Sequence, residues 1–145
     1  MSVRTMEMLD IKIARNEKDF KDLYTLENLA NQPHIREKNR YFGVARLDDF
    51  SVGYWSGNFS GELFASAYFF VAENYQDNDF GYELKKHQLR FAKSLGCKFA
   101  TSIVEPSNLN SWAIQEKCGG EEKLYAEIRY GEISCFTFDL KNLDF

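Results

Sequence analysis

The stretch "VAENYQDNDFGYEL", residues 71–84, decides the fold, because an apolar strand runs into a polar turn and a helix with hydrophobic spacing follows. The first N–H groups of a helix lack intrahelical partners and carry partial positive charge, so such a junction suits a phosphate group. The turn and its flanks are acidic, however, with Glu73, Asp77, Asp79 and Glu83. No Lys or Arg lies between these residues. The sequence predicts a phosphate-binding turn that its own carboxylates weaken.

The strand before this turn is predicted to span Glu62–Ala72. Strict alternation divides its side chains between two faces. One face is wholly apolar, with Leu63, Ala65, Ala67, Phe69 and Val71. The other mixes aromatic and polar groups, as either a cleft wall or an ordinary half-covered sheet would, and carries Glu62, Phe64, Ser66, Tyr68 and Phe70.

The remaining elements follow from periodicity and turn residues. Asn16, with Asp19 three positions on, predicts the N-terminus of a helix after a first strand at residues 9–15. Two further strands are expected at residues 41–47 and 51–56. Gly96 ends the helix that begins near Phe80, and a strand, a helix ending at Gly119, and two strands complete the chain. This order predicts one α+β or mixed α/β domain over residues 1–145.

Composition excludes several classes of protein. The 145 residues carry a net charge of −4 without a Lys/Arg run, so we expect neither nucleic acid nor an anionic membrane as a partner. Apolar runs are too short to span a bilayer and no signal-peptide core is present, which predicts a cytoplasmic protein. Three cysteines without paired spacing, and only His34 and His87, predict buried thiols and no metal site. Both histidines are expected on the surface.

Two motifs resemble the GNAT (GCN5-related N-acetyltransferase) superfamily. Its pyrophosphate loop has the form Arg/Gln-x-x-Gly-x-Gly/Ala, and here Gln76 stands first, Asp79 replaces the first glycine and Gly81 holds the last position. After the fifth strand, the family often has Asn, a small residue, Tyr and Lys-x-Gly. This chain follows that register with Asn108, Ser111, Gln115, Lys117 and Gly119, in which Gln115 replaces the tyrosine.

The resemblance implies a mostly antiparallel sheet with helices on both faces, and acetyl-CoA in a split between the strands that end near Ala72 and Val104. The pantetheine arm would pair beside Phe69 and Val71. The pyrophosphate would rest on the turn, through Gln76, Asp77, Asn78, Asp79, Phe80 and Gly81. The second motif would hold the arm, through Asn108, Ser111 and Gln115. An amine acceptor would enter from the opposite side, where Glu62 is the candidate base or amine anchor and Tyr68 a candidate hydrogen-bond donor.

Two departures leave alternatives open. A carboxylate about 5 Å from a phosphate repels it by roughly 3 kcal/mol at an effective dielectric near 20, unless Asp79 instead caps the helix or faces solvent. Gln115 cannot supply the proton that the family's tyrosine gives to the leaving thiolate. The alternative to an N-acetyltransferase is an inactive GNAT-like domain that binds a partner through Tyr54, Trp55 and Phe59. The acceptor amine stays open among sugar amines, polyamines, antibiotics and protein N-termini, as does a homodimer.

Overall fold

The computed structural model describes residues 9–76, 79–104, 109–128 and 131–143. The chain alternates between strands and helices in the predicted order. The elements are β1 (Leu9–Ile13), α2 (Glu17–Leu29), β2 (Arg40–Leu47), β3 (Phe50–Ser60), β4 (Leu63–Val71), the short 3-10 helix η1 (Glu73–Tyr75), α3 (Phe80–Ser94), β5 (Phe99–Val104), α4 (Leu109–Lys117), β6 (Glu121–Ile128) and β7 (Gly131–Asp139).

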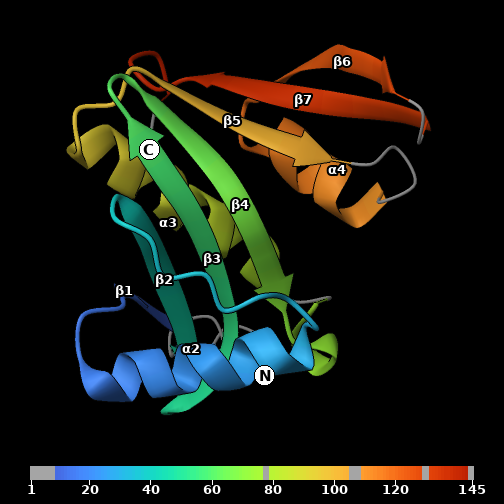
Figure 1. Cartoon of the computed structure of the whole chain (residues 1–145). Helices are drawn as coiled ribbons and strands as arrows, with labels where there is room; N and C mark the ends of the chain where they lie inside the picture. The colour runs from blue at the N-terminus through green and yellow to red at the C-terminus, as the bar shows by residue number, and fades with distance from the viewer. Residues whose placement is uncertain (1–8, 77–78, 105–108, 129–130, 144–145) are drawn as a thin grey trace.

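The strands form one seven-stranded sheet in the order β1-β2-β3-β4-β5-β7-β6 (Figure 1). Neighbouring strands are antiparallel except β4 and β5, which run parallel. A parallel pair needs a crossover, and α3 provides it. The predicted mixed, mostly antiparallel sheet is confirmed.

Helices cover both faces of the sheet, as predicted. Helix α2 lies on one face, where Leu23 and Leu26 pack with buried residues of β2 and β3, among them Val44 and Tyr54. Helices α3 and α4 lie on the other face, behind the sheet in Figure 1. The larger core is there and includes Trp55, Phe64, Phe80, Leu84, Leu89, Phe136 and Phe138.

The start of α2 has the predicted cap. The Asn16 side chain accepts a hydrogen bond from the Asp19 backbone N–H at 2.9 Å, and Asp19 accepts one from the Arg15 N–H at 3.0 Å. Asp19 and Asp22 also bind the Arg46 guanidinium of β2, at 2.7 and 2.9 Å. These contacts fix α2 against the sheet.

The alternation predicted for the strand before the turn is wrong in its first half. The pairing of β3 with β4 changes register between Ser56↔Tyr68 and Gly57↔Ser66, which leaves Ala67 as an extra residue. A β-bulge of this kind moves the following side chains to the opposite face. Phe64 therefore lies in the α3-side core together with Val71, while Tyr68 and Phe70 pack on the α2 side.

The parallel strands separate soon after they begin. Pairing between β4 and β5 is confined to Leu63↔Phe99, Phe64↔Ala100 and Ala65↔Thr101. Beyond these residues β4 continues to Val71 and β5 turns away to pair with β7 as far as Val104 (Figure 1). The predicted split between the two strands is confirmed.

Candidate functional site

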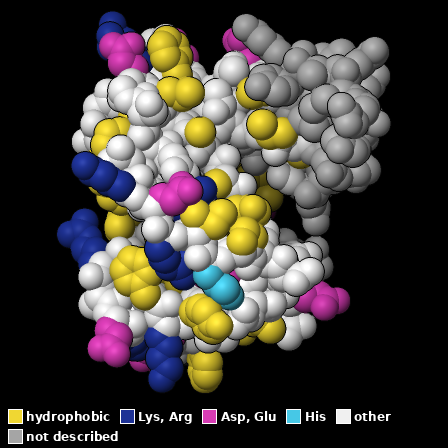
Figure 2. Space-filling model, viewed as in Figure 1, with side chains coloured by type: hydrophobic (Ala, Val, Ile, Leu, Met, Phe, Trp, Pro, Cys, Tyr) yellow, Lys and Arg dark blue, Asp and Glu magenta, His cyan; other side chains and the backbone are white. Residues whose placement is uncertain are grey.

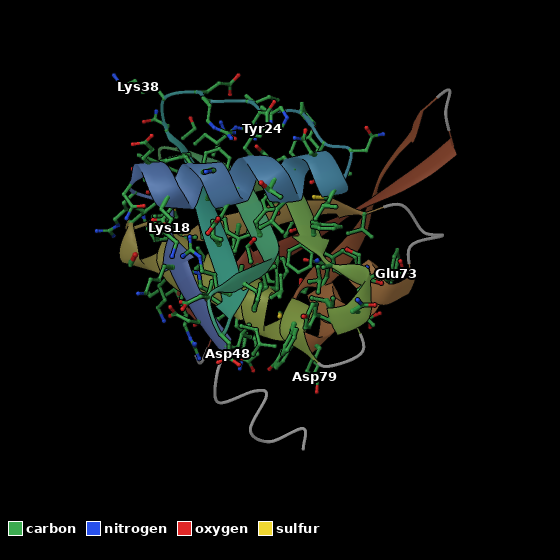
Figure 3. The ribbon with its side chains drawn as sticks, turned by 90° about the horizontal axis from the view of Figure 1, so that it is seen from below. Lys18, Tyr24, Lys38, Asp48, Glu73 and Asp79 are labelled. Atoms are coloured by element: carbon green, nitrogen blue, oxygen red, sulfur yellow. The ribbon has the colours of Figure 1, made fainter. Side chains whose placement is uncertain are left out.

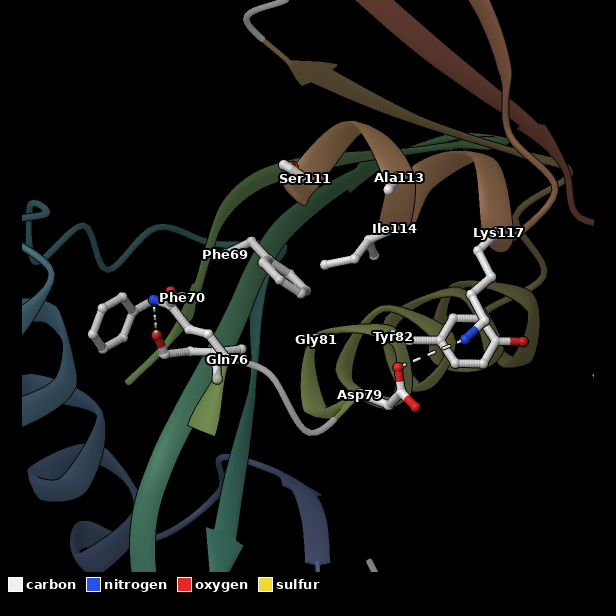
Figure 4. Close-up of a pocket in the computed structure, with 11 residues that line it drawn as sticks. Phe69, Phe70, Gln76, Asp79, Gly81, Tyr82, Ser111, Ala113, Ile114 and Lys117 are labelled. Atoms are coloured by element: carbon white, nitrogen blue, oxygen red, sulfur yellow. Dashed lines mark hydrogen bonds and ion pairs between the residues drawn. The ribbon is translucent and has the colours of Figure 1, made fainter. Parts of the chain in front are cut away.

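A pocket of about 430 Å³ opens at the separated ends of β4 and β5. Its walls come from the end of β4, the turn after it, the start of α3 and the exposed side of α4 (Figure 4). The lining residues are Phe69, Phe70, Val71, Gln76, Asp79, Gly81, Tyr82, Ser111, Ala113, Ile114 and Lys117. The structure thus brings together the strand, turn and helix segments that the two sequence motifs marked.

Gly81 lies close to α4, and its lack of a side chain leaves room for Ile114. A Cβ atom at this position would meet Ile114 Cδ1 at 2.7 Å and Phe69 Cε1 at 3.7 Å. The pocket floor is therefore shaped by a missing side chain in the first turn of α3, where backbone N–H groups are available to an anion.

Asp79 stands immediately before α3, with φ 60° and ψ 11°. Asp and Asn tolerate this left-handed conformation better than most residues, which explains how the chain dispenses with the family's glycine. Among the described residues its side chain makes no capping hydrogen bond, so the capping alternative is wrong. The carboxylate Oδ1 instead lies 3.7 Å from Lys117 Nζ (Figure 4).

Gln76 lines the pocket but folds back on the strand. Its side-chain amide donates a hydrogen bond of 2.9 Å to the Val71 carbonyl. This bond satisfies the last carbonyl of β4 and fixes the start of the turn. Phe80, by contrast, is buried in the core, where its ring stacks on Tyr75 at 5.7 Å between centroids. Asp77, Asn78 and Asn108 lie outside the described residues.

On α4, Ser111, Ile114 and Lys117 lie three residues apart and face the pocket. Gln115 is buried outside the pocket lining, and its Oε1 atom has no hydrogen-bond partner within the described residues. Sequence reasoning did not select Tyr82, Ala113, Ile114 or Lys117 as site residues. The signal for the last two was available in the i, i+3, i+6 spacing from Ser111.

The two candidate catalytic residues lie apart from the pocket. Glu62 precedes β4 at its opposite end, where its exposed carboxylate pairs with Lys98 at 2.8 Å. Tyr68 lies on the α2 face among Tyr54 and Phe70, and its backbone N–H donates to Ser56 Oγ at 3.1 Å. Tyr68 is thus on the side that the resemblance assigns to an acceptor, whereas Glu62 is at the far end of the strand.

A buried polar cluster joins α3 to both separating strands. Lys85 Nζ donates to Gln88 Oε1 at 2.6 Å and to Ser102 Oγ of β5 at 2.5 Å. Gln88 Nε2 in turn donates to Ser66 Oγ of β4 at 3.1 Å. Complete burial of the amine lowers the pKa of Lys85 to about 7, because the charged form loses its hydration.

Two of the three aromatic residues proposed for a protein partner are not available on the surface. Tyr54 and Trp55 are fully buried, and Phe59 is partly buried against the larger core. Trp55 Nε1 donates to His87 Nδ1 at 3.0 Å, and burial lowers the pKa of His87 to about 4. His87 is only partly buried, so the expectation that it is a surface residue is met in part, and the partner-binding alternative loses two of its three anchor residues. The three cysteines are buried, as predicted.

Charges are mixed on the face covered by α2. Figure 2 shows Lys, Arg, Asp and Glu side chains interspersed there. His34 stacks on the exposed ring of Tyr24, with 4.0 Å between the ring centroids. Seen from below, α2 with Tyr24 lies on one side of the sheet, and Asp79 lies toward the other (Figure 3).

Within the described ranges, no helix is both long and apolar enough to cross a membrane. The same ranges contain no group of three or more His, Cys, Asp or Glu side chains that could hold a metal ion.

Comparison with known families adds a sequence match to this geometry. The sequence profile of the acetyltransferase (GNAT) family matches residues 5–120, well over half of the chain. No curated protein matches the chain significantly.

Solved structures share the fold at low sequence identity. The chain is similar to the ribosomal-protein-S18-alanine N-acetyltransferase of Escherichia coli, at 15% identity and a TM-score of 0.70, with 94% of this chain and 100% of that chain covered. It is similar to the Vibrio cholerae spermidine N-acetyltransferase solved with CoA and spermine, at 15% identity, a TM-score of 0.74 and coverages of 94% and 99%. It is also similar to an N-acetyltransferase of Staphylococcus aureus, at 14% identity and a TM-score of 0.72, with 93% of this chain and 99% of that chain covered.

Proposed function

The chain belongs to the acetyltransferase (GNAT) family, and we propose that it transfers an acetyl group from acetyl-CoA to a primary amine of a small molecule or a protein. The observation that carries this proposal is the pocket at the split between β4 and β5. Separation after Ala65 leaves the edge of β4 beside the pocket without a neighbouring strand in the part of the chain that the structure describes. Backbone groups along such an edge need partners, which an extended amide-containing chain can supply.

The residues present fit the charged and extended parts of acetyl-CoA. Phe69 and Val71 line the strand side of the pocket, and Gly81 keeps the first turn of α3 accessible. Lys117 is the cation nearest to this turn among the lining residues. These groups would hold the pantetheine arm and the pyrophosphate. Acetyl-CoA supplies an activated thioester, so the protein has to position the reactants and stabilise negative charge rather than form a covalent bond.

The acceptor would approach from the α2 side of the sheet. Tyr68 lies there, on the strand whose other face leads to the pocket, and its phenol is a candidate to position an amine. Glu62 has no part in this arrangement, because it lies at the start of β4 and pairs with Lys98. Gln115 occupies the position of the family's tyrosine without an ionisable proton, so we expect slow turnover.

Calorimetric titration with acetyl-CoA tests the first half of the proposal, at ligand concentrations up to about 1 mM, where complexes of about −4 kcal/mol become half saturated. Release of free thiol in the presence of a polyamine, an amino sugar or a peptide with a free N-terminus tests the second half. A protein-free blank corrects for spontaneous acetylation. Binding with amine-dependent thiol release supports the proposal. If acetyl-CoA produces neither binding heat nor a thermal shift, the result favours the alternative, which is a GNAT-like domain without turnover that serves in binding or assembly.

A further inference from the structure

We propose that Asp79 competes with the phosphates of the ligand for Lys117, so that anion binding in the pocket proceeds by an exchange of the Lys117 partner. This inference rests on the proposed function, because it assumes that a CoA-type ligand enters the pocket. It assigns to Lys117 the role of the phosphate-binding cation and to Asp79 that of a counter-ion that sets the affinity.

The exchange follows from where the two side chains lie. Asp79 precedes the first turn of α3 and Lys117 is the last residue of α4, yet both line the same pocket. Figure 4 shows the carboxylate and the ammonium group pointing toward one another. The 3.7 Å ion pair therefore lies where the first turn of α3 would receive a phosphate.

The pair is weak enough to be exchanged. The side chains of Lys117 and Asp79 are 53% and 74% exposed. Exposed pairs of this kind contribute about 0–1 kcal/mol, so a phosphate can take the place of the carboxylate at little cost. The ammonium group is kept in place meanwhile by the Tyr82 ring, whose centroid lies 4.2 Å from Nζ.

The pocket thus holds a cation that is already paired. A ligand phosphate that pairs with Lys117 displaces the Asp79 carboxylate. The carboxylate is then left without a positively charged partner, next to the negatively charged phosphate. Loss of the carboxylate should help the ligand in two ways, by freeing Lys117 and by removing repulsion. Only the first of these gains depends on Lys117, and this dependence separates exchange from simple repulsion.

A neighbouring ion pair provides the matched control. Glu83 and Lys86 pair at 3.1 Å on α3, and Lys86 Nζ lies 4.6 Å from the same Tyr82 ring. Neither residue lines the pocket. Glu83→Gln changes the net charge as Asp79→Asn does, in the same region, without freeing Lys117.

The test is a double-mutant cycle of CoA binding by calorimetry at low salt, with Asp79→Asn, Lys117→Met and the double variant, and with Glu83→Gln as control. Asn keeps the left-handed backbone that position 79 needs. We expect Asp79→Asn to tighten CoA binding about tenfold, Lys117→Met to weaken it about tenfold, and the gain from Asp79→Asn to fall to about threefold or less without Lys117. Glu83→Gln should change the affinity less than threefold.

Ligand fragments identify the phosphate concerned. Dephospho-CoA lacks the 3′-phosphate and keeps the pyrophosphate, whereas pantetheine has neither. Retention of the gain with dephospho-CoA and its loss with pantetheine assign Lys117 to the pyrophosphate, and loss with both assigns it to the 3′-phosphate. A gain that persists with pantetheine, or that is equal with and without Lys117, overturns the exchange while leaving CoA binding intact. Absence of CoA binding in every variant, the wild type included, overturns the proposed function and this inference with it.

Discussion

The ammonium nitrogen of Lys85 lies 2.5 Å from the hydroxyl oxygen of Ser102, one residue beyond the last position at which β5 pairs with β4. Through Gln88 the same amine is linked to Ser66, the corresponding residue of β4. A fully buried lysine thus connects α3 to both strands at the point where they separate. Its described hydrogen-bond partners are neutral, and the Phe138 ring lies 5.1 Å from Nζ.

Replacement of Lys85 should change how stability depends on pH. Burial lowers the pKa of Lys85 from 10.5 to about 7 in the folded protein, so the folded state releases a proton that the unfolded chain keeps between these values. Stability should therefore rise with pH from about 7 to 10.5, and the penalty should be complete below pH 7. Burial also raises the pKa of Cys118, a titratable group near Lys85 that directly follows α4, to about 11, so this thiol stays protonated over most of the window.

Urea denaturation of Lys85→Met and the wild type at pH 7 and pH 9.5 measures this dependence. We expect the wild type to gain up to a few kcal/mol between the two pH values and the variant to gain much less. Lys86→Met is the control and should behave like the wild type, because Lys86 is only partly buried and pairs with Glu83. Parallel pH profiles for all three proteins would show that Lys85 stays charged in the fold.

His87 should remain neutral over the physiological range. Desolvation lowers its pKa to about 4, and Trp55 Nε1 donates to its Nδ1 atom, which must therefore carry no proton. The folded pKa lies below the ordinary value of 6.5, so stability should be lost as pH falls from about 6.5 toward 4. Side-chain NMR should show the His87 resonances unchanged between pH 8 and 5.5, with their assignment made by His87→Asn. Titration near pH 6.5 would contradict the buried hydrogen bond.

Filling the space above Gly81 should close the pocket. An alanine Cβ would lie 2.7 Å from Ile114 Cδ1, the flexible end of that side chain, so the protein can fold with a small shift of α4. We expect Gly81→Ala to weaken CoA binding about tenfold, while stability changes by about 1 kcal/mol or less because alanine favours the helix. Ile114→Ala in the same protein should restore part of the affinity. Undiminished binding by Gly81→Ala would place the ligand elsewhere.

The end of α4 requires a left-handed residue. Gly119 has φ +88°, and a Cβ there would meet Leu143 Cδ2 at 2.9 Å. Gly119→Val should therefore destabilise the domain by about 1–3 kcal/mol, through backbone strain and the contact together. Gly119→Asn should cost less, because asparagine tolerates the conformation. Thermal unfolding measures both, and equal melting temperatures for Val, Asn and wild type would contradict this description of the helix end.

Local signals in the sequence were sufficient for the elements and their order. Asn16 with Asp19, and Gly119, each fix a helix end through backbone geometry that depends on a few neighbouring residues. The bulge at Ala67 was not predictable, because the run from Phe64 to Val71 is mostly apolar on both faces and its alternation carries no information about a skipped partner.

The site was only partly predictable for a related reason. The turn and the small residues around it follow from the chain itself, whereas the contact between Asp79 and Lys117 depends on how α3 packs against α4. Lys85 resembled a surface lysine of an amphipathic helix, since nothing near it in the sequence indicates that its position faces the interior. Such facts belong to tertiary packing, which periodicity does not encode.

The short pairing between β4 and β5 also gives the molecule a mechanical property. Three residue pairs join the four N-terminal strands to the three C-terminal strands within the sheet. A force that pulls these two groups apart sideways would load their hydrogen bonds in succession, beginning at Ala65 and Thr101, where the two strands separate. The sheet should therefore part along this line before any of its antiparallel pairs, and a molecule bound across the split would raise the force that is needed.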